Sequence, residues 1–379
     1  MLRPMRAEWD MLFVNSGVKA LDLMSQAPCD VIISDMRMPG MNGAELLAEV
    51  LKRFPQTVRL MLSGHADRDL VLKCVGATHQ YLSKPCRPED LKAAITRACD
   101  LQESLRDQNL RHLMARMERV PSIPGLYIKI VEKLEDPEIP LQEIGDIVAK
   151  DIGMTAKILK LVNSSFFGLG REISNPGEAV AYLGVETIKS LVLSVHAFSQ
   201  FETAPLGVFS IEALWQHSQS TAGLAKAIAC MEVAEPKIIE EAFVAGLLHD
   251  IGKLILAANF PSQYDQALEM RRAGTLALVT AEENTFGANH AEVGGYLLGL
   301  WGLPVPVVEA IALHHSPTQC THKGFSPLTA VHAANALVNF ERPLDTVFAS
   351  DTMDSNYLGL LGLEGRVETW RANGGANLE

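Results

Sequence analysis

The chain has 379 residues, of which 48% are hydrophobic, and its 45 acidic and 33 basic residues give a formal net charge of −12. Such a length exceeds one ordinary domain, and an acidic chain without a Lys/Arg tract excludes a broad nucleic-acid surface. The sequence has no apolar run of membrane-spanning length and no secretory signal, and its six cysteines are scattered without a CxxC motif, so we expect a cytoplasmic protein with free thiols.

Residues 1–100 alternate short β-rich runs with helical patterns. The β-rich runs are Met11–Val14, Val31–Ser34, Val58–Leu62 and Gln80–Ser83, and the helical patterns are Val18–Gln26, Ala44–Phe54 and Asp67–Val75. Strands that alternate with short helices predict βαβ units and a parallel sheet.

Three polar residues end successive runs of this predicted sheet. Asp35 follows the second run, Ser63 follows the third, and Lys84 follows the fourth. The carboxyl ends of parallel strands share one edge of a sheet, where α/β proteins bind ligands. A single Asp at a strand end is more often a turn cap, but three groups at matching ends favour a site. An aspartate nucleophile there could accept a phosphoryl group whose oxygens bind Lys84 and Ser63.

The motifs around these residues are "DVIISDMRMPGMNG", "LSGHAD" and "YLSKPCRPEDL". They resemble the receiver domain of bacterial two-component response regulators, over residues 1–100. The resemblance implies an α/β flavodoxin-like fold and a sensor histidine kinase as partner. It also implies that Asp35 is the phosphoacceptor, that Ser63 and Tyr81 are the switch residues, and that Lys84 precedes a cis peptide bond to Pro85.

The sequence departs from the receiver pattern at its start. Receivers begin with a strand that carries a magnesium-binding acidic pair, whereas "WDMLFVNSGVKAL" matches the second strand and the segment after it. We therefore expect a receiver that lacks its first strand. Without the acidic pair, Asp35 is expected to hold Mg²⁺ only weakly, because this ion requires near-octahedral oxygen ligands.

A long helical pattern follows from residue 88 to about residue 119, and we assign 101–119 as a linker. Its apolar seam consists of Leu91, Ala94, Ala98, Leu101 and Leu105. The narrow seam is typical of a partner helix and predicts a homodimer. Packing on the preceding domain is preferred for residues 88–100, and both alternatives stay open for residues 101–118.

Residues 120–341 are predicted to form an all-helical domain, which opens with the Pro/Gly break "VPSIPGL". For the tail, residues 342–379, we expect looser packing. Within the helical domain several imidazoles and one carboxylate are spaced on separate predicted helices. They are His217, His249, Asp250, His290, His314 and His315, with Asn335 further on. Satisfied core histidines are the simpler explanation for any one of them, but the set could converge on one or two divalent ions.

The helical part also carries a series of longer motifs. They are "VPSIPGL", "IVAKDIGMTAKILKLVNSSFFGL", "EAVAYLGVETIKSLVL", "AGLLHDIGKLIL", "HAEVGGYLLGLWGLP" and "AIALHHSP". They resemble the HDOD output domain of the HD superfamily of metal-dependent phosphohydrolases. The resemblance implies that the set of imidazoles described above, with Asp250, occupies the family's ligand positions for Fe, Mn or Zn.

Asn335 stands where the family has a closing aspartate. An amide lacks the charge that hard cations need, so the resemblance implies a degenerate site and a non-catalytic output domain. We interpret the chain as a response regulator whose receiver controls an HDOD domain that engages a downstream protein or nucleotide. The alternative is a phosphohydrolase or phosphodiesterase of nucleotides or cyclic dinucleotides.

Two further residues of the helical domain have simpler interpretations. Lys253 could bind phosphate, but we expect its side chain to project to solvent. The side chain of Trp301 is expected to lie in the core.

Overall fold

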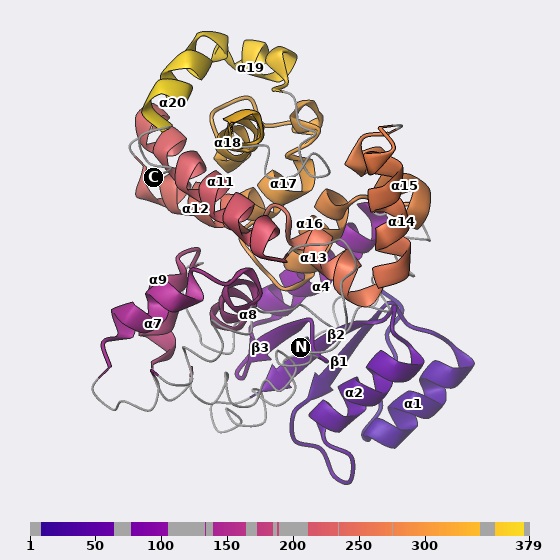
Figure 1. The fold of residues 1–379 in the computed structure, drawn as a ribbon. Coiled ribbons are helices and arrows are strands. Elements are labelled where there is room, and N and C mark those ends of the chain that lie inside the picture. Colours follow the sequence, from indigo (N-terminus) through magenta and orange to yellow (C-terminus); the bar gives the residue numbers. More distant parts are fainter. Residues whose placement is uncertain are drawn as a thin grey trace.

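The computed structural model describes ten stretches of the chain. They are residues 9–63, 77–104, 133, 139–163, 173–184, 188, 211–233, 235–274, 276–341 and 353–374. Figure 1 shows a small α/β part at the N-terminal end and a larger helical part that carries the C-terminal helices at its far end. The predicted fold class, an α/β receiver followed by an all-α domain, is confirmed.

The α/β part is built on three parallel strands in the order β1-β2-β3 within the described residues. Their bounds are β1 Val31–Asp35, β2 Val58–Ser63 and β3 Gln80–Ser83, which match three of the four predicted runs. In the register of the sheet, Asp35 lies beside Leu62, and Ser63 lies beside Ser83. The carboxyl ends of the strands therefore meet at one edge, as predicted.

The strand predicted at Met11–Val14 is wrong, because the structure has no strand there. Leu12 and Phe13 are 63% and 61% exposed. The run has the β-branched and aromatic composition of a strand, but it pairs with none of the three strands in the described part of the chain, so it lacks the ladder of hydrogen bonds that a strand needs. Composition alone could not reveal that missing partner.

Helix α2 (Gly43–Arg53) packs against β1 and β2, and α1 (Gly17–Gln26) lies beside α2, as Figure 1 shows. Asn42 caps α2 in a capping box, in which its side chain accepts from the Glu45 amide and Glu45 accepts from the Asn42 amide. A Cβ at Gly43 would lie 2.2 Å from the Asp35 carbonyl oxygen. Only glycine permits this approach, which holds the start of α2 beside the end of β1.

Helix α4 (Pro88–Ser104) follows β3 and buries Leu91, Ala94 and Ile95. It packs against α16 (His290–Leu300) of the helical part. The helix predicted at Asp67–Val75 and the linker segment 105–119 lie outside the described residues. The described part of the seam is thus buried within the chain itself, whereas a homodimer stays a prediction.

The helical part contains a series of mostly short helices. They are α7 Leu141–Val148, α8 Ile152–Val162, α9 Pro176–Leu183, α11 Ile211–Glu232, α12 Pro236–Leu248, α13 Ile251–Asn259, α14 Pro261–Arg272, α15 Leu278–Phe286, α16, α17 Val305–Leu313, η5 Pro317–Gln319, α18 Pro327–Glu341, α19 Ser355–Leu361, η6 Glu364–Arg366 and α20 Val367–Gly374. Helices α11, α12, α17 and α18 pack on one another and form the centre of the domain. No helix in the described stretches combines the length and apolarity needed to cross a membrane.

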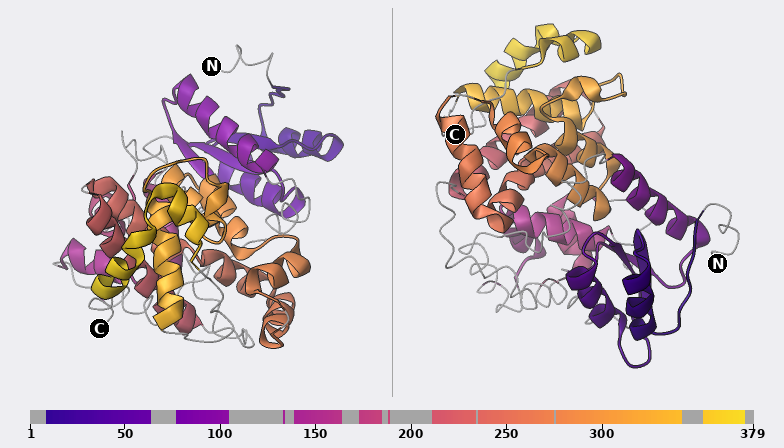
Figure 2. Two further views of the ribbon diagram at one scale, coloured as in Figure 1. Left: turned by 90° about the horizontal axis from the view of Figure 1, so that it is seen from above. Right: turned by 90° about the vertical axis from the view of Figure 1, so that its right-hand side faces the viewer.

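The C-terminal helices are packed, so the prediction of a loose tail is wrong for residues 353–374. Trp370 on α20 is fully buried, and its indole N–H donates to Glu232 at 2.8 Å. Arg366 donates to the same carboxylate oxygen. The prediction was based on the glycine-rich composition of the tail and did not consider Trp370, whose side chain packs α20 against α11. The last view in Figure 2 shows α19 and α20 at the end of the molecule opposite the sheet.

The two parts meet along β3, α4, α8 and α16. Lys160 on α8 is buried, and its ammonium donates to the Thr78 carbonyl oxygen just before β3. The same ammonium lies 4.6 Å from the ring centroid of Trp301, the C-cap residue of α16. Trp301 is buried as predicted, and its ring forms part of the contact between the two parts.

Candidate functional site

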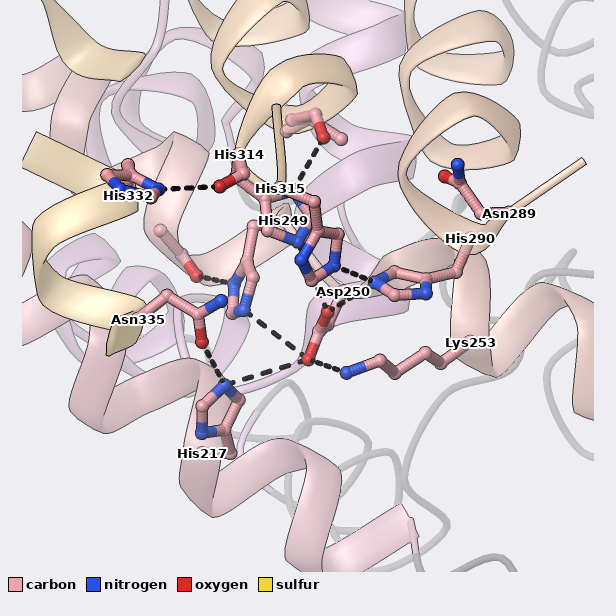
Figure 3. A network of polar contacts seen from close by, with 12 residues as sticks. His217, His249, Asp250, Lys253, Asn289, His290, His314, His315, His332 and Asn335 are labelled. Carbon is pink, nitrogen blue, oxygen red and sulfur yellow. Dashed lines mark hydrogen bonds and ion pairs between the residues drawn. The ribbon is translucent and has the colours of Figure 1, made fainter. Parts of the chain in front are cut away.

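A cluster of polar side chains lies in the core of the helical part (Figure 3). His249 is the C-cap of α12 and Asp250 is the N-cap of α13, so this pair occupies the break between two helices. His217 comes from α11, His290 begins α16, and the remaining predicted ligands His314, His315 and Asn335 come from the end of α17 and from α18. The structure therefore brings together every predicted residue of this set.

Asp250 is buried at the centre of the cluster, and its two carboxylate oxygens face different groups. Oδ1 lies 3.2 Å from His290 Nε2 and 3.8 Å from His314 Nε2. Oδ2 lies 2.7 Å from Lys253 Nζ and 3.3 Å from His249 Nε2. Burial alone would raise the pKa of this carboxyl, but the neighbouring imidazole of His249 and ammonium of Lys253 hold the pKa well below its usual range.

The contacts of His249 and His314 determine which ring nitrogen faces the cluster. His249 Nδ1 lies 2.7 Å from the Gly246 carbonyl oxygen, and His314 Nδ1 lies 2.8 Å from the Ile311 carbonyl oxygen. A carbonyl oxygen only accepts, so in the neutral rings Nδ1 carries the hydrogen and Nε2 presents a lone pair inward. Burial lowers the pKa of His314 well below its usual value and keeps this ring neutral.

Three buried atoms of the cluster have no hydrogen-bond partner: His249 Nε2, His314 Nε2 and Asp250 Oδ1. In the neutral rings His249 Nε2 and His314 Nε2 carry lone pairs, and they lie 3.3 and 3.8 Å from the oxygens of the Asp250 carboxylate, which only accept. Buried polar atoms are rarely left unpaired, and imidazole nitrogens with a carboxylate oxygen are the ligands that Zn, Fe and Mn prefer. The residues present therefore fit a divalent transition-metal ion.

The potential ligand atoms form two groups that share Asp250. One group is Asp250, His290, His314 and His315, and the other is His217, His249 and Asp250; within each group the atoms lie within 4.8 Å of one another. His315 Nε2 lies 2.8 Å from His290 Nε2. Ligand atoms that each lie about 2.1 Å from one ion are necessarily within about 4 Å of one another. The spacing within each group is therefore close to that of a metal site.

Glu282 on α15 supports the cluster and was missed by sequence reasoning. Its Oε2 lies 2.6 Å from His290 Nδ1 and accepts from the His290 amide at 2.9 Å, while Tyr264 donates to Oε1 at 3.1 Å. Burial is the largest influence and opposes protonation of His290, but the Glu282 charge together with the contacts to Asp250 and Glu282 raises the pKa of His290 to about 9. A carboxylate behind a ligating imidazole is the usual orienting partner in metal sites. The only signal in the sequence was an acidic residue on the buried face of "LVTAEENTF".

The side chain of Asn335 forms a hydrogen bond with His217. Its Oδ1 lies 2.9 Å from His217 Nε2 and accepts from Asn339 Nδ2 at 3.1 Å. Burial is the main cause that lowers the pKa of His217 to about 3, so the ring is neutral. The single ring hydrogen therefore lies on Nε2, where it is donated to the amide oxygen.

Lys253 lies in the cluster, and the prediction that it projects to solvent is wrong. Its side chain is 5% exposed, and it is three residues from Asp250 on the first turn of α13. The "HDIGK" spacing places the ammonium on the inner face of the helix, where the buried carboxylate offsets the cost of removing it from water. His332 was also missed: its ring lies 2.8 Å from the His314 carbonyl oxygen and accepts from the Asp354 amide at the start of α19.

The second predicted site lies at the carboxyl ends of the strands. Lys84 donates to Asp35 Oδ2, and the Arg37 amide donates to Oδ1 at 3.3 Å. Both side chains of the Asp35–Lys84 pair are about 40% exposed, at 41% and 40%. Ser63 ends β2 with a buried hydroxyl, and Tyr81 is fully buried within β3. The Lys84–Pro85 bond is cis, as predicted.

Two family models match the chain. The model of the HDOD domain matches residues 120–317, and the model of the response regulator receiver domain matches residues 5–96. The HDOD match covers more than half of the chain, and together the two matches cover both candidate sites except Asn335.

The chain is also similar to curated proteins and to solved structures. An uncharacterized protein of Treponema pallidum is 25% identical over 285 residues, which is 74% of this chain and 52% of that protein. The hydrogenase transcriptional regulatory protein HoxA of Cupriavidus necator is 28% identical over 186 residues, 45% of this chain and 37% of the relative. This chain thus spans about half or less of these two curated relatives.

Among solved structures, the MmoQ response regulator of Methylococcus capsulatus superposes with a TM-score of 0.50 and 22% identity, covering 64% of this chain and 98% of the other. This likeness concerns the fold. The chain belongs to the HDOD family and carries a response regulator receiver domain before the HDOD domain, which is the composition of a two-component response regulator.

Proposed function

We propose that Asp35 accepts a phosphoryl group from a sensor histidine kinase and that the receiver passes this signal to a non-catalytic HDOD domain. The observation that carries the proposal is the pairing of Asp35 with Lys84 at an exposed edge of the sheet. An exposed carboxylate can be reached by a phosphodonor, and the lysine ammonium can stabilise the charge that develops on the phosphoryl oxygens.

The contact between the two domains gives the signal a path. Lys84 follows β3, Thr78 precedes β3 and binds Lys160, and α4 packs on α16. A rearrangement at the end of β3 therefore acts on the helix that begins with His290. The downstream protein or nucleotide would read the resulting change in the helical domain.

Phosphorylation can be tested on the full chain. Incubation with acetyl phosphate, with and without Mg²⁺, should add the mass of one phosphoryl group, and Asp35→Asn should abolish the addition. Hydrogen exchange of the phosphorylated form should change in β3 and α16. If the intact mass stays unchanged under strong loading, Asp35 is not a phosphoacceptor, and the receiver serves as a scaffold, for example for a homodimer.

A second candidate function, divalent-metal binding in the HDOD domain, is favoured by the three unpaired lone-pair atoms around Asp250. A bound Mn, Fe or Zn ion would act there as a Lewis acid or activate water for hydrolysis of a phosphodiester. Elemental analysis of purified protein tests the binding, and hydrolysis of a nucleotide diester tests the chemistry. We expect a bound ion without hydrolysis, because Asn335 replaces a closing carboxylate.

A further inference from the structure

We propose that the HDOD domain holds a single divalent ion on Asp250 Oδ1, with His290, His314 and His315, and that Lys253 and Asn335 close the second ion position on Asp250 Oδ2. The inference rests on the second candidate function, metal binding. The Oδ1 half of the cluster binds the ion, and the Oδ2 half does not.

The Oδ1 side offers four ligand atoms from three chain segments: the start of α13, the start of α16 and the end of α17. Asp250 Oδ1 and His314 Nε2 are buried and have no hydrogen-bond partner. His290 Nδ1 faces Glu282, so that ring is oriented with Nε2 toward Asp250, 3.2 Å from Oδ1. His315 Nε2 lies beside His290 Nε2. A carboxylate and three imidazoles make a complete four-coordinate set.

The Oδ2 side already contains a cation. The Lys253 ammonium lies 2.7 Å from Oδ2, closer than either imidazole of that group. An ion bound there would have to displace the ammonium or stand against its positive charge in a buried environment. Lys253 thus supplies at Oδ2 the charge that a second ion would supply.

Asn335 removes a further ligand from the Oδ2 side. Asn339 donates to the amide oxygen of Asn335, which sets the orientation of the amide with its oxygen toward His217. His217 Nε2 then carries a hydrogen and donates it to that oxygen. A nitrogen that carries a hydrogen offers no lone pair to a metal. His249 Nε2 and one shared carboxylate oxygen remain, and two ligands are too few for a protein-held ion.

The test is Co²⁺ binding by the full-length chain after treatment with a chelator. Equilibrium dialysis with elemental analysis gives the number of bound ions, and the d–d absorption of Co²⁺ reports its coordination. We expect one ion per chain. His315→Ala should weaken binding by at least about 100-fold, the upper range for losing even an indirect partner, and should alter the d–d spectrum. His315 is only half-buried, and His315→Gln offers the same test at similar volume.

Two other variants test the closed position. His217→Ala should leave the number of ions and the spectrum unchanged, as should the matched control His322→Ala, which removes an exposed histidine. Asn335→Asp combined with Lys253→Met should add a second ion, because the new carboxylate can serve as a ligand and no ammonium then lies at Asp250 Oδ2. Circular dichroism checks that each variant is folded.

The number of bound ions in each variant can contradict a different part of the proposal. Two ions in the unsubstituted chain, or loss of the ion in His217→Ala, would overturn the assignment to Oδ1. A single ion in the double variant Asn335→Asp with Lys253→Met would overturn the part given to the amide and the ammonium. Failure of Co²⁺ to bind at all would remove both this inference and the second candidate function, while phosphorylation of Asp35 would stand on its own mass measurement.

Discussion

The receiver and the HDOD domain each centre on an aspartate paired with a lysine, but the two pairs differ in burial. Asp35 and Lys84 are 41% and 40% exposed, whereas Asp250 and Lys253 are 1% and 5% exposed. Water screens the exposed pair, so its two charges can separate at little cost. The buried pair cannot separate without leaving a charge in the core. Under the proposed function, the same two types of side chain would serve a reaction at a sheet edge and charge neutralisation in a helical core.

The largest expected effect is on the buried pair. Lys253→Met leaves the Asp250 charge without its nearest cation, and breaking such a pair costs about 3–5 kcal/mol of unfolding free energy. Urea unfolding of the chelator-treated protein measures the loss. A loss below about 1 kcal/mol, typical of exposed pairs, would show that the surrounding imidazoles already neutralise Asp250 without Lys253.

The pH dependence of stability should reflect the imidazoles of the buried site. His290 has a folded pKa of about 9, above the ordinary value of 6.5, so its contribution is complete below pH 6.5 and is lost as pH rises through 9. His217 has a folded pKa of about 3, so the unfolded chain takes up a proton first and stability falls as pH decreases from 6.5 toward 3. Each group changes the unfolding free energy by about 1.4 kcal/mol per pH unit.

Glu282→Gln separates the two limbs of this profile. The substitution removes the charge that raises the pKa of His290, so the loss of stability between pH 6.5 and 9 should disappear while the acid limb remains. Urea unfolding of the metal-free protein at a series of pH values measures both. An alkaline limb that survives in the variant would show that His290 is not its source.

The contact between the domains should respond more weakly. Lys160→Met removes a buried hydrogen bond and a cation–π contact with Trp301, which together contribute about 1–3 kcal/mol. We expect faster hydrogen exchange in β3 and at the end of α16. Lys323→Met, which changes an exposed lysine, is the matched control. Equal exchange in both variants would mean that other contacts hold the domains together.

The smallest expected change belongs to the exposed pair. Lys84→Met should alter the unfolding free energy by about 0–1 kcal/mol, because water screens the Asp35 charge. The same urea unfolding measurement applies, with Lys253→Met as the direct comparison. A loss as large as that of Lys253→Met would end the distinction drawn between the two pairs.

Much of the receiver could be predicted from its sequence because local patterns determine it. Three β-rich runs became strands, and Asp35 and Lys84 met because parallel strands end at one edge. Met11–Val14 failed for the opposite reason, since a strand depends on a neighbour that the run itself does not specify.

In the helical domain the sequence indicated which residues form the cluster. It did not indicate which of them face Asp250 Oδ1 and which face Oδ2. His217 and Asn335 are 118 residues apart, and only the packing of α11 on α18 shows that they pair with each other. Lys253 was misjudged because a lysine near a helix end is usually solvated. Glu282 was missed because its role depends on the position of α15 relative to α16.

Helix α16 begins with His290 and ends beside Trp301, so one rigid element of 11 residues touches both the buried cluster and the receiver contact. Equilibria that share one element are linked reciprocally. Whatever factor receiver docking applies to ion affinity at Asp250, the ion applies the same factor to receiver docking. Binding of an ion in the output domain would then change how the receiver docks. Phosphorylation of the receiver and the concentration of the ion would act on the same equilibrium.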